Sequence, residues 1–131
     1  MMLAALALMI QAPASVAPPV QPAEWAQLPP LPWRVPPRYD GEMARFVMEE
    51  VRAGRCVAAV TTATGQALQV DVALLIASDG RPRAIVPRAI GCATVEQYTS
   101  GLISRAVREN LIPDVERDTW YRASITFHWP S

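Results

Sequence analysis

The chain has 131 residues, a length that makes one domain the expected organisation. Its 12 basic residues, all of them arginine, balance 12 acidic residues, so the formal net charge is zero. A chain without net charge has no strong electrostatic attraction to nucleic acid or to an anionic membrane surface, and we expect neither partner.

The amino terminus has the pattern of a secretory signal. Residues 1–10 form an uncharged apolar run, and Ala12-Pro13-Ala14 follows as a small-residue cleavage site. The run is too short to cross a hydrocarbon core of roughly 30 Å, which takes about 20 residues, so we expect no integral membrane span. No basic residue precedes the run, which leaves a misplaced start or a simple apolar tail as alternatives. We interpret residues 1–14 as a signal peptide and expect a periplasmic protein.

A proline-rich stretch follows, and we interpret residues 15–39 as a spacer. Proline fixes φ and lacks a backbone donor, so this stretch cannot form a helix or a central strand. A polyproline ligand for an aromatic groove is the alternative. Trp25 and Trp33 predict that part of the spacer packs on the surface of the domain.

The domain is expected over residues 40–131 and to begin with a helix. Asp40 is a plausible N-cap, the apolar residues that follow recur at helical spacing, and Gly54 ends the element, which predicts a helix over about 41–53. Residues 56–62 are a short β-prone run. Thr64-Gly65-Gln66 is interpreted as a turn.

A β-hairpin comes next. Val70, Val72 and Leu74 alternate with smaller or polar residues, the pattern of a half-buried strand over 70–77. Asp79-Gly80 supplies the positive φ of a tight turn, and residues 81–90 return as a second strand. Because that return contains two prolines, it should be a sheet edge, bulged or short.

A second helix is predicted by Thr94-Val95-Glu96-Gln97, which fits a capping box with Thr94 as N-cap. An apolar stripe continues through about Asn110 and indicates a helix packed on a sheet; it comprises Val95, Tyr98, Leu102, Ile103, Ala106 and Val107.

The last segment is the clearest strand. Its apolar residues are Tyr121, Ala123, Ile125, Phe127 and Trp129, and the residues between them are Trp120, Arg122, Ser124, Thr126 and His128. This strict alternation predicts a strand with one buried face. The predicted fold class is therefore α+β, a small antiparallel sheet formed by a hairpin and a carboxy-terminal strand, with two packed helices.

Cys56 and Cys92 are the two cysteines. In an exported chain an even count predicts a disulfide, whereas without export they would be buried thiols. Their spacing excludes a CxxC redox or zinc motif.

No arrangement of residues predicts catalysis. His128 is the one histidine and has no second ligand or nucleophile near it in the sequence. Asp114, Glu116 and Asp118 alternate in a loop but lack the glycine and terminal glutamate of a calcium loop. No phosphate-binding loop occurs. We therefore expect no enzymatic activity, no cofactor and no metal.

The order of these elements resembles the carboxy-terminal domain of TonB-type proteins. The resemblance covers about residues 67–129 and rests on the strand over 70–76, Asp79-Gly80-Arg81, Ile85-Val86-Pro87, Arg105-Ala106-Val107-Arg108, Pro113 and the strand over 124–129. It implies a helix, a hairpin, a second helix across the sheet and a last strand at an edge. TonB itself adds a membrane-spanning helix and a long spacer with charged-proline repeats, which this chain does not match, so we do not expect energy transduction.

These observations favour a protein-binding or adaptor module whose partner is an outer-membrane or other envelope protein. The predicted surface is the polar side of the last strand, Trp120, Arg122, Ser124, Thr126 and His128, which would accept an extended peptide by strand addition. Two alternatives remain for this strand: it is only a sheet edge, or the proline-rich segment covers it. The alternative function is a structural envelope protein that self-associates, as a homodimer, or contacts peptidoglycan.

Overall fold

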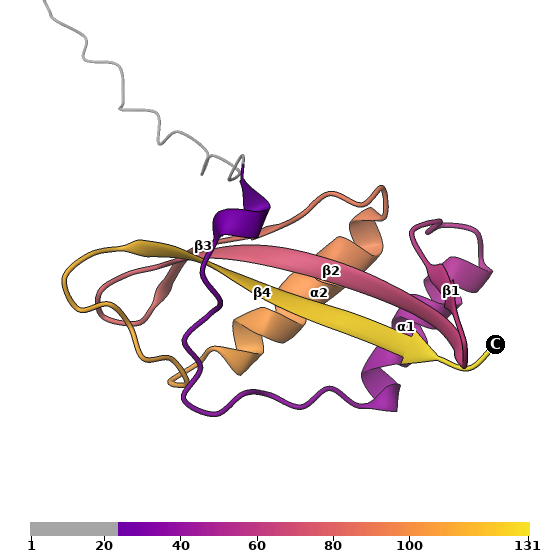
Figure 1. Cartoon of the computed structure of the whole chain (residues 1–131), viewed down its shortest axis with the longest axis horizontal. Helices are drawn as coiled ribbons and strands as arrows, with labels where there is room; N and C mark the ends of the chain where they lie inside the picture. The colour runs from indigo at the N-terminus through magenta and orange to yellow at the C-terminus, as the bar shows by residue number, and fades with distance from the viewer. Residues whose placement is uncertain (1–23) are drawn as a thin grey trace, which may run out of the picture.

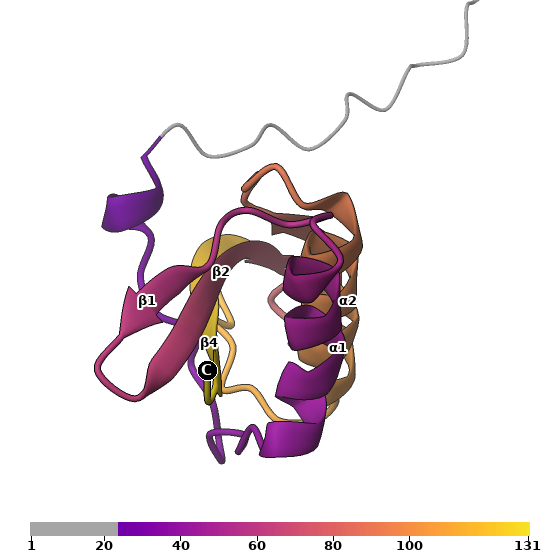
Figure 2. The same ribbon diagram turned by 90° about the vertical axis from the view of Figure 1, so that its right-hand side faces the viewer.

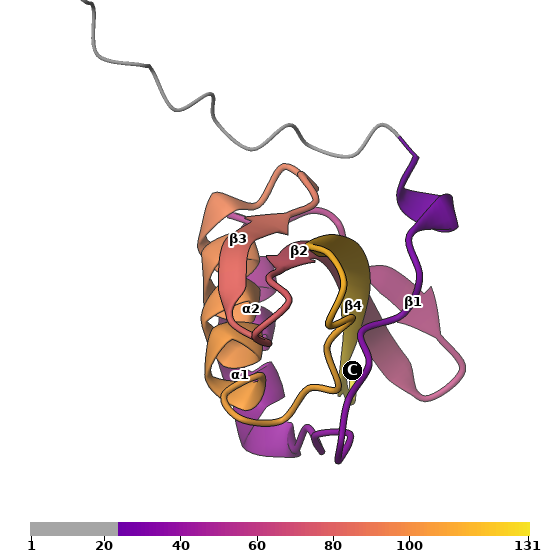
Figure 3. The same ribbon diagram turned by 90° about the vertical axis from the view of Figure 1, so that its left-hand side faces the viewer.

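The computed structural model describes residues 24–131, so the predicted signal peptide and residues 15–23 of the spacer lie outside the described residues. The described part has the predicted α+β fold, with two helices and an antiparallel sheet. The sheet has four strands, because the short β-prone run before the hairpin also contributes one. Its elements are η1 (Trp25–Gln27), α1 (Gly41–Arg52), β1 (Val60–Thr62), β2 (Gly65–Ile76), β3 (Pro82–Pro87), α2 (Ala93–Ala106) and β4 (Thr119–Trp129). Both helices cover the same face of the sheet (Figures 2 and 3).

Strand β2 is the centre of the sheet. β4 pairs with it from Gln66 to Ile76, while β1 and β3 pair with opposite ends of its other edge (Figure 1). Strand β4 is consequently an edge strand over its whole length. Among residues 24–131, no helix is both long enough and apolar enough to cross a membrane.

The core lies between the sheet and the two helices. Alternate residues of β2 and β4 face the helices and are buried, and α1 and α2 contribute the opposite wall. Large apolar side chains of this core with no measurable exposure are Val47, Val70, Val72, Leu74, Val95 and Ile103. Burying such a side chain contributes about 1.5–3 kcal/mol. The alternation predicted for the last strand is confirmed, since its apolar residues are buried and Ser124, Thr126 and His128 are exposed.

The two helices begin differently. Asp40 caps α1 as predicted, because its side chain accepts a hydrogen bond of 3.1 Å from the Met43 N–H. The capping box predicted for α2 is wrong: the N-cap is Cys92, and its side chain makes no capping hydrogen bond. The Glu96 carboxylate instead accepts from the N–H groups of Cys92 (2.9 Å) and Ile90 (3.2 Å). The helix thus starts before Thr94, which leaves Thr94 inside the first turn.

Helix α2 also ends earlier than predicted, at Ala106. Glu109 adopts a positive φ of 53°, and the Asn110 side chain donates back to the Ala106 carbonyl (3.3 Å). The Asn110 hydrogen bond satisfies a free carbonyl group at the end of the helix, and the positive φ of Glu109 turns the chain away from the helical path.

The hairpin matches its prediction. Gly80 has a φ of +86°, and its N–H bonds the Ala77 carbonyl at 2.9 Å. Strand β3 is short and lies at the edge, and the register shifts between Leu75 and Ile76. The turn predicted over residues 64–66 lies one residue earlier, at Ala63 and Thr64, and Gly65 already belongs to β2. A Cβ on Gly65 would lie 2.7 Å from the Cα of Pro130, so only glycine permits this close approach of β2 to the end of β4.

Part of the spacer packs on the domain, as its tryptophans predicted. We call residues 25–33 the strap. Trp25 is 8% exposed and Leu31 is 5% exposed. The strap starts on the sheet face opposite the helices, passes the outer side of β4 and then leads towards α1 (Figures 1 and 3). The Arg88 guanidinium lies 5.6 Å from the centre of the Trp25 ring, a cation–π contact on that face.

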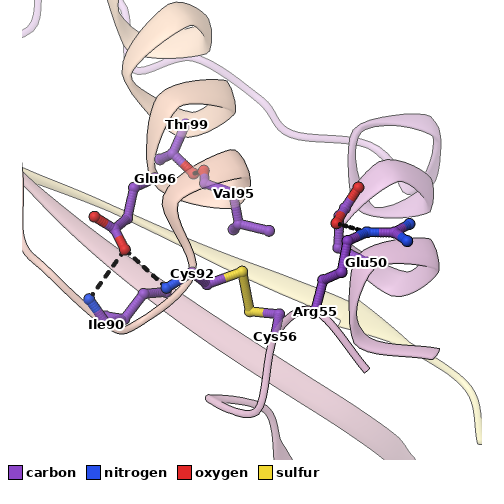
Figure 4. The surroundings of a disulfide bond; sticks show 8 residues. All are labelled: Glu50, Arg55, Cys56, Ile90, Cys92, Val95, Glu96 and Thr99. Atoms are coloured by element: carbon purple, nitrogen blue, oxygen red, sulfur yellow. Dashed lines mark hydrogen bonds and ion pairs between the residues drawn. A yellow bond between two sulfur atoms is a disulfide. The ribbon is translucent and has the colours of Figure 1, made fainter. Parts of the chain in front are cut away.

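The predicted disulfide between Cys56 and Cys92 is present and buried (Figure 4). It joins the segment after α1 to the first turn of α2, with the two Cα atoms 5.0 Å apart. Beside it, the buried Glu50 carboxylate accepts a 2.6 Å hydrogen bond from Arg55. This bond, more than the opposing effect of burial, lowers the pKa of Glu50. The disulfide therefore joins the end of α1 to the start of α2, while the Glu50–Arg55 pair ties the residues after α1 back to its last turns.

Candidate binding edge on strand β4

The five residues predicted as a binding surface lie together along β4. Their side chains alternate with the buried ones and therefore point to the sheet face opposite the helices. Trp120 and Arg122 are half-buried, while Ser124, Thr126 and His128 are exposed. The structure thus divides the predicted set into a covered half and an exposed half.

The strap covers the first half of the edge. The Arg122 N–H donates to the Pro29 carbonyl (2.8 Å), and the Leu31 N–H donates to the Arg122 carbonyl (2.9 Å). These bonds form a parallel bridge between Pro30 and Arg122. The Arg122 guanidinium also donates to the Trp25 carbonyl (3.3 Å). The alternative that the proline-rich segment covers this strand therefore holds for its first half.

The composition of the strap explains why the pairing stops there. Pro29, Pro30 and Pro32 have no N–H, so Leu31 is the one residue of this stretch that can donate to β4. The next donor, the N–H of Trp33, bonds the Leu31 carbonyl (3.0 Å), and the strap turns away to form a bridge with Leu111. The strap therefore pairs with β4 at one position only, around Arg122.

Beyond that rung the edge is open. The backbone N–H and C=O groups of successive residues in a strand point alternately to its two sides. Those of Arg122 point away from β2 to the strap, so those of Ser124, Thr126 and His128 also point away from β2. Within residues 24–131, the outward N–H and C=O groups of these three residues have no hydrogen-bond partner. We call β4 residues 124–128, with these outward groups, the open edge.

The register of the open edge is fixed by a polar cluster on the sheet face opposite the helices. Asp71 of β2 lies across from Ser124, whose hydroxyl donates to it at 2.6 Å. Gln69 donates to the same carboxylate at 3.0 Å, and Arg88 at 3.4 Å. Burial by itself raises the pKa of Asp71, but these three hydrogen bonds outweigh it and lower the pKa. Asp71 is therefore ionised at neutral pH and anchors β4 to β2 beside the open edge.

A shallow groove borders the open edge on the helix side. Its volume is about 150 Å³, and it separates β4 from the start of α1; its lining residues are Tyr39, Asp40, Gly41, Ala44, Thr126, Phe127 and His128. We call it the edge groove. Tyr39 is half-buried there, and burial raises the pKa of its phenol. The backbone of the open edge thus forms one wall of a concave surface.

The contribution of α1 to this surface was not predicted. Asp40 signals where a helix begins, but no local pattern tells which strand its first turn will approach. That approach depends on how α1 packs on the sheet, which is a long-range property.

Other parts of the molecule give weaker indications of a functional site. A cavity of about 500 Å³ lies at the hairpin end of the molecule, and its charged lining mixes Arg34 and Arg81 with Asp79 and Glu109. In the acidic loop, Asp118 forms an ion pair with Arg83 at 3.1 Å. Over residues 24–131, no three potential metal-ligating side chains gather as a metal site would require.

Comparison with known proteins gives no relative for this chain: no protein-family model matches it, and no significant match exists among curated proteins or solved structures.

Proposed function

We propose that the protein is a non-catalytic, periplasmic binding or adaptor module of TonB-like fold, which binds an extended segment of an envelope protein by strand addition on the open edge. The observation that carries this proposal is the row of outward backbone groups at Ser124, Thr126 and His128. The succession of helix, hairpin, helix and edge strand supports the TonB-like assignment.

The strap supports the proposed binding mode. Residues 29–31 are an extended segment that already lies on this edge and forms two backbone hydrogen bonds with Arg122. The same geometry continues along the strand, and two of the three exposed residues beyond it, Ser124 and Thr126, carry no charge that could repel a neighbouring chain. A partner segment would therefore extend the pairing that the strap begins.

The energetics indicate modest affinity. Three residues with paired N–H and C=O groups offer up to about six hydrogen bonds, each with a net contribution of about 0.5–1.5 kcal/mol. Ordering the partner offsets much of this gain. Side-chain contacts must therefore supply the selectivity.

Proline substitution at Thr126 tests the proposal. Its N–H faces outward, so Thr126→Pro removes a donor from the open edge without removing a bond of the β2–β4 ladder. Thr61→Pro is the matched control, because Thr61 is an exposed residue whose N–H also faces away from β2, on β1. Both variants are first checked for folding by circular dichroism.

The binding probe is a display library of random linear peptides, selected on the wild-type protein. We expect the selected peptides to bind the Thr61→Pro variant as tightly as the wild type. Their affinity for the Thr126→Pro variant should fall at least about tenfold, because the hydrogen bond from the Thr126 N–H is missing and the adjacent backbone hydrogen bonds are strained. Equal affinity for all three proteins, or failure to select any peptide, would rule out strand addition.

Self-association is the second candidate, favoured by the sequence of the open edge. An antiparallel pair about Thr126 would place Thr126 opposite its own copy and His128 opposite Ser124, both acceptable polar pairs. Sedimentation should then show dimers at micromolar concentration that dissociate in the Thr126→Pro variant. A wild-type protein that stays monomeric would exclude the dimer.

A further inference from the structure

We infer that the edge groove selects the partner segment by admitting one apolar side chain, up to the size of a phenyl ring, between β4 and the first turn of α1. This inference rests on the proposed function, since it specifies which extended segments the open edge accepts. It concerns the side chains of the partner, whereas strand addition concerns its backbone.

The position of the edge groove follows from the geometry of an added strand. Side chains of such a strand point alternately to the two faces of the sheet. Those on the helix face, at the level of Phe127, would meet the edge groove, which is lined by both β4 and α1. Those on the other face would lie beside the exposed side chains of Thr126 and His128, in solvent. The edge groove therefore restricts the choice of side chain only at alternate residues of the partner segment.

The lining of the edge groove sets the chemistry of that position. Ala44 and Phe127 are buried and apolar, Gly41 has no side chain, and the Tyr39 ring packs against the core. Asp40 is engaged in capping, since its carboxylate accepts from Met43. A partner's acidic side chain would lose hydration beside this carboxylate and be repelled by it. An apolar side chain faces neither cost.

The size of the edge groove limits its occupant to one side chain. A volume of about 150 Å³ is far below the roughly 300 Å³ at which pockets for small-molecule ligands begin, but a cavity of about this size can hold one aliphatic group or one benzene ring. The restricted position is therefore expected to carry one apolar residue, aliphatic or phenylalanine, flanked by polar residues. Proline is excluded at partner positions whose N–H faces the open edge.

A titration followed by nuclear magnetic resonance tests the inference. The probes are synthetic peptides Thr-Ser-Thr-X-Thr-Ser-Thr, with X as Val, Gly, Asp or Phe, added to the full-length protein at up to millimolar concentration. The amide signals of Ser124, Thr126 and His128 report pairing with the open edge, and those of Gly41 and Ala44 report filling of the edge groove. We expect the Val and Phe peptides each to bind about tenfold more tightly than the Gly peptide, and the Asp peptide to show no gain over Gly.

Two glycine variants separate the edge groove from other effects. A Cβ at Gly41 would meet no atom within 4 Å, so Gly41→Leu can occupy the edge groove without disturbing the core. Gly101→Leu is the control, because Gly101 has the same freedom on α2. The preference for Val over Gly should disappear in Gly41→Leu and persist in Gly101→Leu.

The outcomes distinguish the two levels of the proposal. If all four peptides shift the open-edge signals with equal affinity, strand addition stands and selection by the edge groove is wrong. If the preference for Val survives in Gly41→Leu, the apolar position lies elsewhere and the inference is also overturned. If no peptide shifts the signals of the open edge, both the inference and the proposed function fall.

Discussion

At the scale of single residues, Asp71 and Ser124 connect the stability of the sheet to the candidate site. The alternation of β2 predicts that Asp71 lies on the less apolar face, but the strand pattern alone does not show which residue of β4 lies across from it. Pairing in register places the Ser124 hydroxyl on its carboxylate at 2.6 Å. Sequence reasoning could thus assign the face of each residue but not its partner.

Asp71 makes stability depend on pH. Because its pKa is lower in the folded protein, its contribution is fully present above the ordinary carboxyl pKa and is lost as the pH falls through the lowered value. We expect Ser124→Ala, which removes one of the hydrogen bonds to the carboxylate, to raise the pKa of Asp71. Titration of the Asp71 carboxyl signal by nuclear magnetic resonance measures this shift. An unchanged midpoint would show that the Ser124 hydroxyl does not stabilise the ionised form.

At the scale of elements, strongly periodic hydrophobic patterns predicted the helices and strands correctly, whereas the ends of α2 were predicted wrongly. The strands around Val70 and Ile125 and the helix after Asp40 were predicted because a buried face leaves a repeating pattern in the sequence. The start of α2 was missed because Glu96 reaches back to two N–H groups from inside the helix, a contact outside the usual capping spacing. Gly65 was misassigned because a glycine required by close packing has the same sequence signal as one in a turn.

The disulfide should stabilise the elements that it joins. Cys56 and Cys92 are separated by 36 positions, and closing a loop of that length stabilises the fold by about 3–4 kcal/mol in the chain-entropy treatment. We expect the double variant Cys56→Ala, Cys92→Ala to lose about this much free energy of unfolding, measured in urea. A loss below about 1 kcal/mol would show that the packing of the core suffices to hold α1 against α2.

The strap should limit the length of the open edge. Leu31 is 5% exposed, so Leu31→Ala removes buried apolar contacts and should cost about 2–3 kcal/mol. It should also loosen the bonds to Arg122, whose N–H would exchange faster with solvent. Val35→Ala is the control, since Val35 is 69% exposed and its loss should change stability by less than about 0.5 kcal/mol. Unchanged exchange at Arg122 in the Leu31→Ala variant would show that the strap does not depend on this anchor.

At the scale of the whole molecule, the fold class followed from the order of elements, whereas the surface depended on how they pack. The sequence predicted a carboxy-terminal strand with one polar face, and that strand lies at an edge. It left open whether the proline-rich segment covers this edge. That question is decided by Leu31, the one backbone donor of residues 29–32, which pairs with Arg122 before the strap turns away. The edge groove required the packing of α1 beside β4 and has no signature in the sequence.

The most direct test of the central claim is photo-crosslinking in cells that produce the protein. A photoreactive amino acid is placed at Thr126 on the open edge or, as a control, at Thr61 on β1, and the crosslinked products are identified by mass spectrometry. We expect the probe at Thr126 to capture a segment of an envelope protein, with the yield strongly reduced when His128→Pro blocks the same edge, and the probe at Thr61 to capture none of it. No product at Thr126, or equal products from both positions, would contradict the assignment of the open edge as the binding surface.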